Sequence, residues 1–287
     1  MLAQHIVNGL VQGALYALVA VGLTLVYGIL EVINFAHGEL YMLGAFALYL
    51  LLAWAHLPYG PSLLLTVLAL AGVGHLLARA TMVPHLRRPF ESTVLATLAA
   101  SIILQNGARV AFTATPRQAN PPLEDVVVRL GDVVVTGQRL LALGAALLAF
   151  AALHLFIRRA RAGKAMRAAA QSKDACAMVG IDVGRVAARA VALGGGLCGL
   201  AGAVVAPLYD IFPGIGTMAV FKSFAVVIMG GLGNVPGAMA AAALLGVGES
   251  LAGGYASTTA KDAFGFTLMI LVLLVRPQGL FGRRVRV

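Results

Sequence analysis

Charged side chains are scarce in this sequence of 287 residues, of which only 11% are Asp, Glu, Lys or Arg and 60% are hydrophobic. A water-soluble globular domain usually carries about 25% charged residues. So much apolar surface is unfavourable in water but is tolerated by a lipid bilayer. The composition therefore excludes an ordinary soluble protein and predicts an integral membrane protein.

The residue patterns of an enzyme or a metalloprotein are also missing. The two cysteines and six histidines show no metal-ligand spacing, and there is no Gly-x-Ser-x-Gly motif. Gly163-Lys164 lacks the preceding glycine and the following Ser/Thr of a phosphate-binding Walker A loop. Cys176 lies in a basic stretch and Cys198 in an apolar one, so we expect no disulfide. We predict no catalytic residue, no metal site, no cofactor and no ATP hydrolysis by this chain.

The net charge of +10 does not indicate nucleic-acid binding. Lys and Arg cluster between apolar blocks, as residues next to a membrane do, and we expect lipid rather than nucleic acid as their surroundings. The first 30 residues contain no Asp, Glu, Lys or Arg and lack the basic start of a cleavable signal, so they predict a retained membrane segment.

About 20 apolar residues cross a bilayer as a helix. Segments without Asp, Glu, Lys or Arg cover residues 1–30, 40–78, 92–108, 140–157, 190–209, 223–248 and 263–275. The second contains a turn signal at residues 56–61 and so holds two helices, and the last reaches spanning length if it starts near Ser257. These segments predict an all-α membrane protein of about eight transmembrane helices, forming a single domain over residues 1–287.

Basic loops predict the orientation. Arg79, Arg87 and Arg88 form one basic region, residues 158–189 contain eight Lys/Arg, and the chain closes with Arg276, Arg283, Arg284 and Arg286. The positive-inside rule places all three regions, and therefore the C-terminus, in the cytosol. The segment at about 114–139 then lies outside, where its runs Val126–Val128 and Val133–Val135 could form a small hairpin.

The number of predicted spans conflicts with this orientation. Both the basic loop at 158–189 and the C-terminus are predicted inside, but three spans lie between them, where an even number is required. The segment 223–248 contains Gly230, Gly231, Gly233, Asn234, Pro236 and Gly237, a break that would restore parity if two segments meet and turn there. Broken helices are tolerated where they line protein or a water-filled cavity, so the break indicates a pathway; the alternative is a glycine-rich packing interface. Residues 31–39 interrupt the N-terminal half similarly, either as a loop or as an unwound stretch within the membrane.

The segment from Gly163 to Asp182 is too polar to cross a membrane and too small to be a domain. It predicts two short helices, one from about Lys164 and one from about Lys173 that ends at Gly180, because glycine commonly terminates helices. Such a segment is either a contact for a soluble partner or a basic loop that only sets topology.

Four motifs in this sequence resemble the permease family of branched-chain amino-acid ABC transporters. They are residues 34–39 (NFAHGE), the segment 163–181, residues 227–238 followed by Gly248-Glu249, and residues 271–279 (LVLLVRPQG). The resemblance runs in order from about residue 6 to residue 282, and the basic loop 79–89 is similar as well.

The resemblance implies an importer in the bacterial cytoplasmic (inner) membrane. In this family two permease chains, identical or homologous, form one pathway above two ATP-binding cassette subunits, which bind the ATP. An external substrate-binding protein delivers leucine, isoleucine, valine or a related ligand. The resemblance also implies that the cytosolic segment at about 158–189 couples to the ATPase, through Gly163, Lys164, Arg167, Ala168, Asp174 and Gly180.

Polar residues within the apolar segments are candidates for the pathway, because acidic groups in a bilayer are costly and are usually functional. The candidates are Asn34, His37, Glu39, Gly230, Gly231, Gly233, Asn234 and Glu249, with Glu31 also considered. Each acidic residue could instead be interfacial, bound to headgroups or to a helix-end amide. Alternative functions are the same kind of importer for urea or short amides, an ion-coupled secondary transporter, or a membrane-embedded enzyme.

Overall fold

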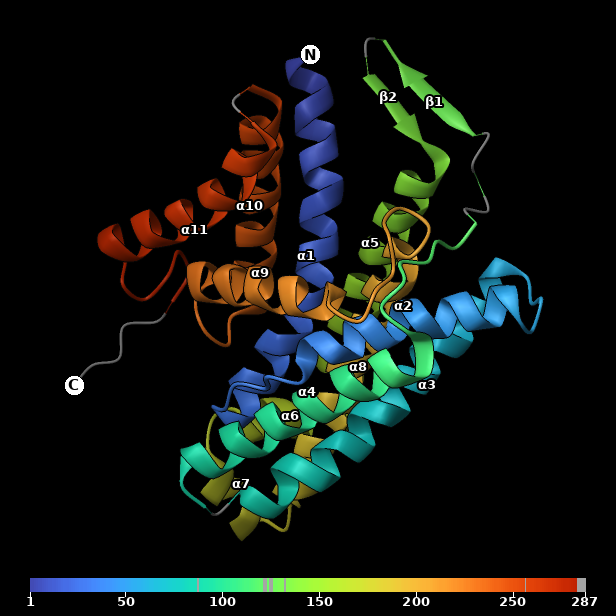
Figure 1. Ribbon diagram of the computed structural model, residues 1–287. Coiled ribbons are helices and arrows are strands. Elements are labelled where there is room, and N and C mark those ends of the chain that lie inside the picture. Colours follow the sequence, from blue (N-terminus) through green and yellow to red (C-terminus); the bar gives the residue numbers. More distant parts are fainter. Residues whose placement is uncertain (87, 121–122, 124–125, 132, 256, 283–287) are drawn as a thin grey trace.

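The computed structural model describes residues 1–86, 88–120, 123, 126–131, 133–255 and 257–282. The chain is predominantly helical, as expected (Figure 1). The apolar helices are α1 (Leu2–Leu30), α2 (His37–Ala53), α3 (Tyr59–Leu77), α4 (Phe90–Phe112), α5 (Gly137–Arg159), α8 (Val183–Val205), α9 (Ile215–Gly230), α10 (Val235–Tyr255) and α11 (Thr258–Val275). A π turn and a 3-10 turn, η1 (Ala78–Met82) and η2 (Val83–His85), extend α3.

Six helices in the described residues are long and apolar enough to cross a membrane: α1, α3 with its extension, α4, α5, α8 and α10. Three shorter apolar segments accompany them, namely α2, α9 and residues 263–275 of α11. The prediction of a multi-span helical membrane protein is therefore confirmed, whereas the finer prediction of about eight transmembrane helices, one or two of them broken, is not confirmed. Two predicted spans correspond to shorter helices: α2 ends at Ala53, before the turn at 54–58, and the described apolar part of α11 covers only residues 263–275.

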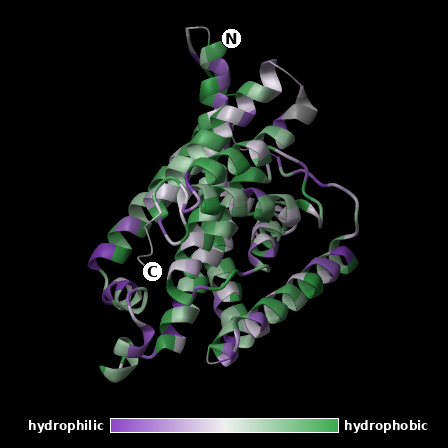
Figure 2. Cartoon of the chain, turned by 90° about the vertical axis from the view of Figure 1, so that its left-hand side faces the viewer, coloured by the Kyte–Doolittle hydropathy of each residue, from purple (hydrophilic) through white to green (hydrophobic). Residues whose placement is uncertain are grey.

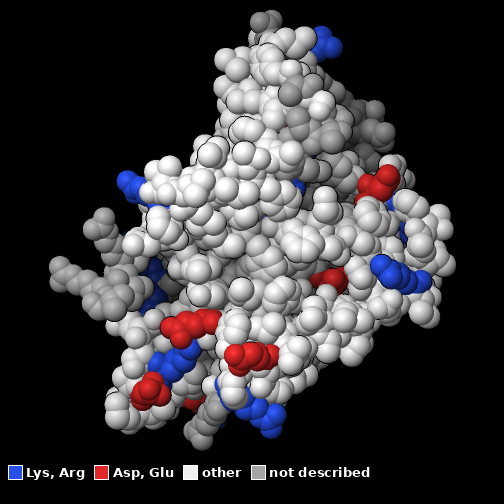
Figure 3. Space-filling model, turned by 60° about the vertical axis from the view of Figure 1, so that its left-hand side comes forward, with Lys and Arg blue, Asp and Glu red and all other residues white. Residues whose placement is uncertain are grey.

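Hydrophobic and hydrophilic residues occupy different parts of the structure. Figure 2 shows hydrophobic residues along most helices and hydrophilic residues mainly at helix ends and in loops. On the face drawn in Figure 3, charged side chains gather mainly in the lower part and along the edges, and large areas carry none. Uncharged helix surfaces of this kind suit contact with lipid.

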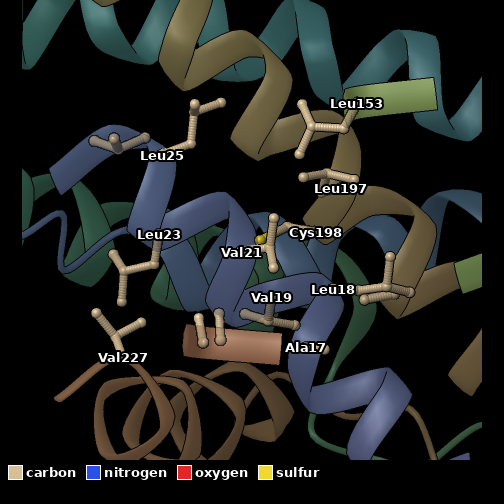
Figure 4. Close-up of a cluster of buried hydrophobic side chains, with 14 of the residues drawn as sticks. Ala17, Leu18, Val19, Val21, Leu23, Leu25, Leu153, Leu197, Cys198 and Val227 are labelled. Carbon is tan, nitrogen blue, oxygen red and sulfur yellow. The ribbon is translucent and has the colours of Figure 1, made fainter. Parts of the chain in front are cut away.

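The core is built around α1 and α8, which are largely buried. Leu18, Val21 and Val26 of α1 are fully enclosed, and Figure 4 shows side chains of α1 together with Leu197 of α8 and Val227 of α9. Small residues allow the helices to approach closely, as is usual between helices in membranes. These small residues permit α1 to pack directly against α10, and they permit α8 to pack directly against α2 and α3.

The predicted break in the C-terminal half separates α9 from α10. Both Gly231 and Gly233 have positive φ, 101° and 78°, which favours glycine, and the turn reverses the chain between the two helices. Gly233 lies beside Gly28, near the end of α1, whereas Gly254, near the end of α10, lies beside His5 at the start of α1. Because α9 is a separate helix before α10, the four helices α8 to α11 follow the basic loop, an even number as the predicted orientation requires.

The interruption at residues 31–36 is an unwound stretch that returns into the protein. The ring Nε2 of His37, the first residue of α2, lies 3.1 Å from the carbonyl oxygen of Val19. From Val19 to Leu30, α1 rises about 16 Å at 1.5 Å per residue. The helix α2 therefore begins deep inside the molecule and not level with the end of α1.

The two ends of the molecule differ in structure. At the hairpin end, β1 (Val127–Leu130) pairs with β2 (Val133–Thr136) as an antiparallel hairpin, which confirms the prediction from the valine runs. At the α6–α7 end lie the short helices α6 (Arg161–Ala169) and α7 (Lys173–Met178), also as predicted. Residues 82–86 and 88 and residues 276–282 reach this same end. Within these regions, residues 87, 121–122, 124–125 and 132 and the basic residues Arg283, Arg284 and Arg286 lie outside the described part of the chain.

Candidate translocation site

Three helices bring a tyrosine, a lysine and a glutamate together inside the molecule. The Nζ of Lys222 on α9 forms an ion pair with Oε1 of Glu249 on α10. The hydroxyl of Tyr16 on α1 donates a hydrogen bond of 2.8 Å to Oε2 of Glu249. Lys222 is only 6% exposed and Glu249 is fully buried. Both carboxylate oxygens of Glu249 are therefore held by side chains of other helices.

This charged cluster borders a central cavity of about 390 Å³. The wall of this cavity is mostly apolar, and its polar lining comes from Gln12, Tyr16, Tyr41, Tyr209, Asp210, Lys222 and Ser223. The Tyr209 hydroxyl donates a hydrogen bond of 2.9 Å to Oε1 of Gln12, which joins the 206–214 loop to α1. A cavity of this size, mostly apolar with a few convergent polar groups, is typical of small-molecule sites.

Lys222 was missed as a candidate from the sequence, although a signal was present. It is the single Lys or Arg between Arg189 and Lys261. It lies directly before the charge-free segment 223–248 and was used only to mark where that segment begins. A lone cation within 70 residues of apolar sequence is costly in a membrane and normally has a buried partner, which here is Glu249.

Glu39 lies on α2 and is 3% exposed. Its Oε1 accepts a hydrogen bond of 3.1 Å from the hydroxyl of Ser101 on α4. Its Oε2 has no hydrogen-bond partner among the described residues. A buried carboxylate with one unsatisfied oxygen is energetically costly and marks a second polar position inside the molecule.

His37 and Asn34 hold the start of α2. Nε2 of the His37 ring lies 3.1 Å from Sγ of Cys198 on α8, and the Asn34 side chain accepts a hydrogen bond of 3.1 Å from the backbone N–H of Ala36. Both residues are fully buried. They fix the unwound stretch against α1 and α8.

The glycine-rich candidates lie elsewhere, at the α6–α7 end. The Asn234 amide donates 2.8 Å to the carbonyl of Phe281 and its Oδ1 accepts from Gly237 N–H at 2.9 Å. Gly233 and Asn234 line a cleft of about 590 Å³ with Glu31, Ala170 and other residues. The structure thus distributes the predicted pathway residues over several places: Glu249 pairs with Lys222 of the central cavity, Glu39 and His37 lie on α2, and residues 230–234 lie at the α6–α7 end.

The predicted coupling residues share the short helices at the α6–α7 end. Gly163 packs against the backbone of Ile157, and a Cβ there would lie 2.6 Å from the Cα of Ile157. Arg167 donates a hydrogen bond to the carbonyl of the same residue. Of the other candidates, Lys164, Asp174 and Gly180 are exposed and Ala168 is half-buried. Gly180 has φ +80° and ends the α7 turn.

The helix α7 carries exposed apolar side chains at its end and contacts the end of α1 at its start. Met178 and Val179 are 82% and 74% exposed, which is unusual for apolar side chains at a charged end. Lys173, the first residue of α7, forms an ion pair of 3.0 Å with Glu31, the residue that follows α1. It also donates 3.0 Å to the carbonyl of Leu30. These two contacts connect the start of α7 with the end of α1, the helix that carries Tyr16.

The structure defines a multi-span helical membrane protein with buried charges beside a central cavity, the features of a membrane transport protein. Among the described residues, no group of three or more His, Cys, Asp or Glu side chains could hold a metal ion. The sequence matches the family model described as "Branched-chain amino acid transport system / permease component" over residues 5–273. The chain belongs to this family of permease components.

Relatives extend over nearly the whole chain. The permease protein LivH of a high-affinity branched-chain amino-acid transport system from Salmonella typhimurium is 34% identical, covering 98% of this chain and 95% of its own length. The corresponding BraD of Pseudomonas aeruginosa is 33% identical with the same coverage. A probable branched-chain amino-acid permease, LivH of Methanocaldococcus jannaschii, is 28% identical over 96% of this chain and 91% of its own. All three are described as permeases, in agreement with a transport rather than an enzymatic role.

Proposed function

We propose that this chain is the membrane-spanning permease domain of an ABC importer that carries branched-chain or related small amino acids across the cytoplasmic membrane. The full-length match to permeases of branched-chain amino-acid systems carries this proposal. In it, two ATP-binding cassette subunits bind the ATP, a second homologous permease chain completes the pathway, and an external binding protein delivers the substrate.

The α6–α7 end faces the cytosol in this proposal, and the C-terminus lies there as well. The concentration of Lys and Arg at this end supports the assignment through the positive-inside rule. The hairpin end and the N-terminus then face outward, toward the binding protein.

Coupling to the ATPase is assigned to α6 and α7. The exposed pair Met178 and Val179 offers an apolar contact, and the Lys173–Glu31 ion pair links that contact to α1. Closure of the ATP-binding subunits would move α7 as a rigid body, and α1 would carry the displacement toward Tyr16 and Glu249. The pathway is proposed to pass the central cavity and Glu249, with Glu39, His37 and Asn34 supporting α2 beside it.

Co-purification of the importer tests the coupling. We expect the wild-type permease to recover the ATP-binding subunits and the double change Met178→Asp and Val179→Asp to lose them, because two charges replace the apolar contact. Val126→Asp, on an exposed residue at the hairpin end, is the matched control and should retain them. Retention of the ATPase by the double variant at normal expression would count strongly against the assignment.

Uptake assays separate the alternatives. Labelled leucine should accumulate in proteoliposomes only with internal ATP and the loaded binding protein, and a protonophore should not abolish it. Collapse of uptake with the ion gradient at constant ATP would indicate a secondary transporter instead. Preferential uptake of urea or a short amide would change the assigned substrate but not the assignment as an ABC importer.

A further inference from the structure

The Lys222–Glu249 ion pair lies in the wall between two cavities. Lys222 lines the central cavity of about 390 Å³, and Glu249 lines a neighbouring cavity of about 280 Å³ toward the hairpin end. Gln12, Leu15 and Tyr209 line both. The pair therefore lies beside the lining that the two cavities share.

We infer that Lys222 and Glu249 bind the charged head group of a zwitterionic amino acid in transit, with its carboxylate at Lys222 and its ammonium at Glu249. This inference rests on the proposed import function and assigns the substrate contact within it. Each buried charge currently neutralises the other. A zwitterion can replace both halves of the pair at once, so that neither Lys222 nor Glu249 is left with an unpaired charge.

Ligands with a single charge do not meet this condition. A carboxylate without an amino group would pair with Lys222 and leave Glu249 buried and uncompensated, and an amine would do the reverse. Removing one partner of a buried ion pair is strongly unfavourable, because the remaining charge has lost its hydration without compensation. The pair therefore selects for zwitterions by electrostatic balance.

Tyr16 prepares Glu249 for the exchange. Its hydroxyl donates a hydrogen bond of 2.8 Å to Oε2 of Glu249, whereas the ion pair with Lys222 is formed by Oε1. Glu249 can therefore stay in position while Lys222 turns toward the ligand. Leu15, Val19, Ile215 and Met218 line the same cavity and provide an apolar wall for a hydrocarbon side chain.

Cysteine protection tests the inference without relying on the external binding protein. Ala219 lines the central cavity three residues before Lys222, so Ala219→Cys places a reporter there. The background carries Cys176→Ala and Cys198→Ala, which removes both native cysteines. The rate of maleimide labelling is measured on the assembled, nucleotide-free importer with leucine, with 4-methylpentanoate (no amino group) or with isopentylamine (no carboxylate).

Leucine at ten times its half-protecting concentration should slow labelling about tenfold by simple occupancy, whereas both analogues at that concentration should change it by less than about twofold. Lys222→Met should abolish protection by leucine and create protection by isopentylamine, because Glu249 then lacks a cation. Glu249→Gln should create protection by 4-methylpentanoate, because this change removes the negative charge that pairs with Lys222. Arg129→Met, which removes an exposed cation of the β1–β2 hairpin that lines neither cavity, is the control and should leave protection by leucine unchanged.

If a single variant does not assemble, Lys222→Met combined with Glu249→Gln removes both charges and leaves none unpaired. This double variant must lose protection by leucine. Equal protection by all three compounds, or leucine protection that survives in the double variant, would overturn the inference. ATP-driven leucine uptake by the wild type without leucine protection would refute this site alone, whereas absence of such uptake would refute the proposed function.

Discussion

Gly13 is a position where α1 lies directly against the backbone of α10 near the candidate site, and its substitution should affect both stability and transport. A Cβ at Gly13 would lie 2.7 Å from the carbonyl oxygen of Ala242 and 3.0 Å from the Cα of Ala243. Both are backbone atoms, which cannot rotate away. Relaxing the oxygen contact to about 3.4 Å requires the two helices to separate by about 0.7 Å.

The magnitude follows from two opposing terms. Overpacking a well-packed interface costs about 1–3 kcal/mol, whereas alanine stabilises a helix by about 1 kcal/mol relative to glycine. Gly72→Ala on α3 is the matched control, because a Cβ there meets nothing within 4 Å. The propensity term is common to both variants, so Gly13→Ala should be less stable than Gly72→Ala by about 1–3 kcal/mol.

Leucine uptake should also be lower for Gly13→Ala than for Gly72→Ala. Gly13 lies three residues before Tyr16, so the displacement weakens the 2.8 Å hydrogen bond from Tyr16 to Glu249. Thermal unfolding of the purified importer, monitored by size-exclusion chromatography, measures stability. Labelled leucine uptake at matched expression measures function. Equal melting temperatures and equal uptake for Gly13→Ala and Gly72→Ala would refute the reasoning.

Two further predictions concern single acidic residues. Glu39→Gln should lower uptake several-fold while the ATP-binding subunits still co-purify, because a buried carboxylate is replaced by a neutral isostere; wild-type uptake at matched expression would contradict a pathway role. Asp182 accepts a 3.0 Å hydrogen bond from the backbone N–H of Arg185 at the start of α8, and this bond lowers the pKa of Asp182 below its ordinary value. Asp182→Ala should therefore destabilise the protein near neutral pH, whereas Asp182→Asn should retain most of the cap. Since the folded-state pKa is lowered, the difference between wild type and Asp182→Ala should shrink as the pH falls below about 4 and through that lowered pKa. A difference in unfolding that is the same at neutral and acidic pH would argue against the cap.

Local features of the chain were predictable because neighbouring residues determine them. The charge-free segments gave the apolar helices, the two valine runs gave the β1–β2 hairpin, and Gly180 marked the end of α7. The glycines at 230–233 indicated the break between α9 and α10. The predicted number of about eight spans is not confirmed: the described residues form six helices of spanning length and three shorter apolar ones, and hydropathy alone does not fix where each helix begins and ends.

The candidate site was predictable only in part. Glu249 and Glu39 were recognisable as acidic residues within apolar segments, and both are buried. The glycine-rich candidates, in contrast, lie at the α6–α7 end, apart from Glu249 and the central cavity. The break was located correctly, but its depth relative to the other helices depends on how α1 and α10 pack.

Taken alone, the sequence determined that this is a helical membrane protein, where its helices are interrupted and which family it resembles, because hydropathy, turn residues and motifs are properties of short segments. Only the tertiary structure decided which polar residues meet. Tyr16 and Glu249 are 233 positions apart, and Lys222 and Glu249 are 27 apart on separate helices. Their contact requires the close packing of α1, α9 and α10 through small residues, and burial then forces the charges to pair.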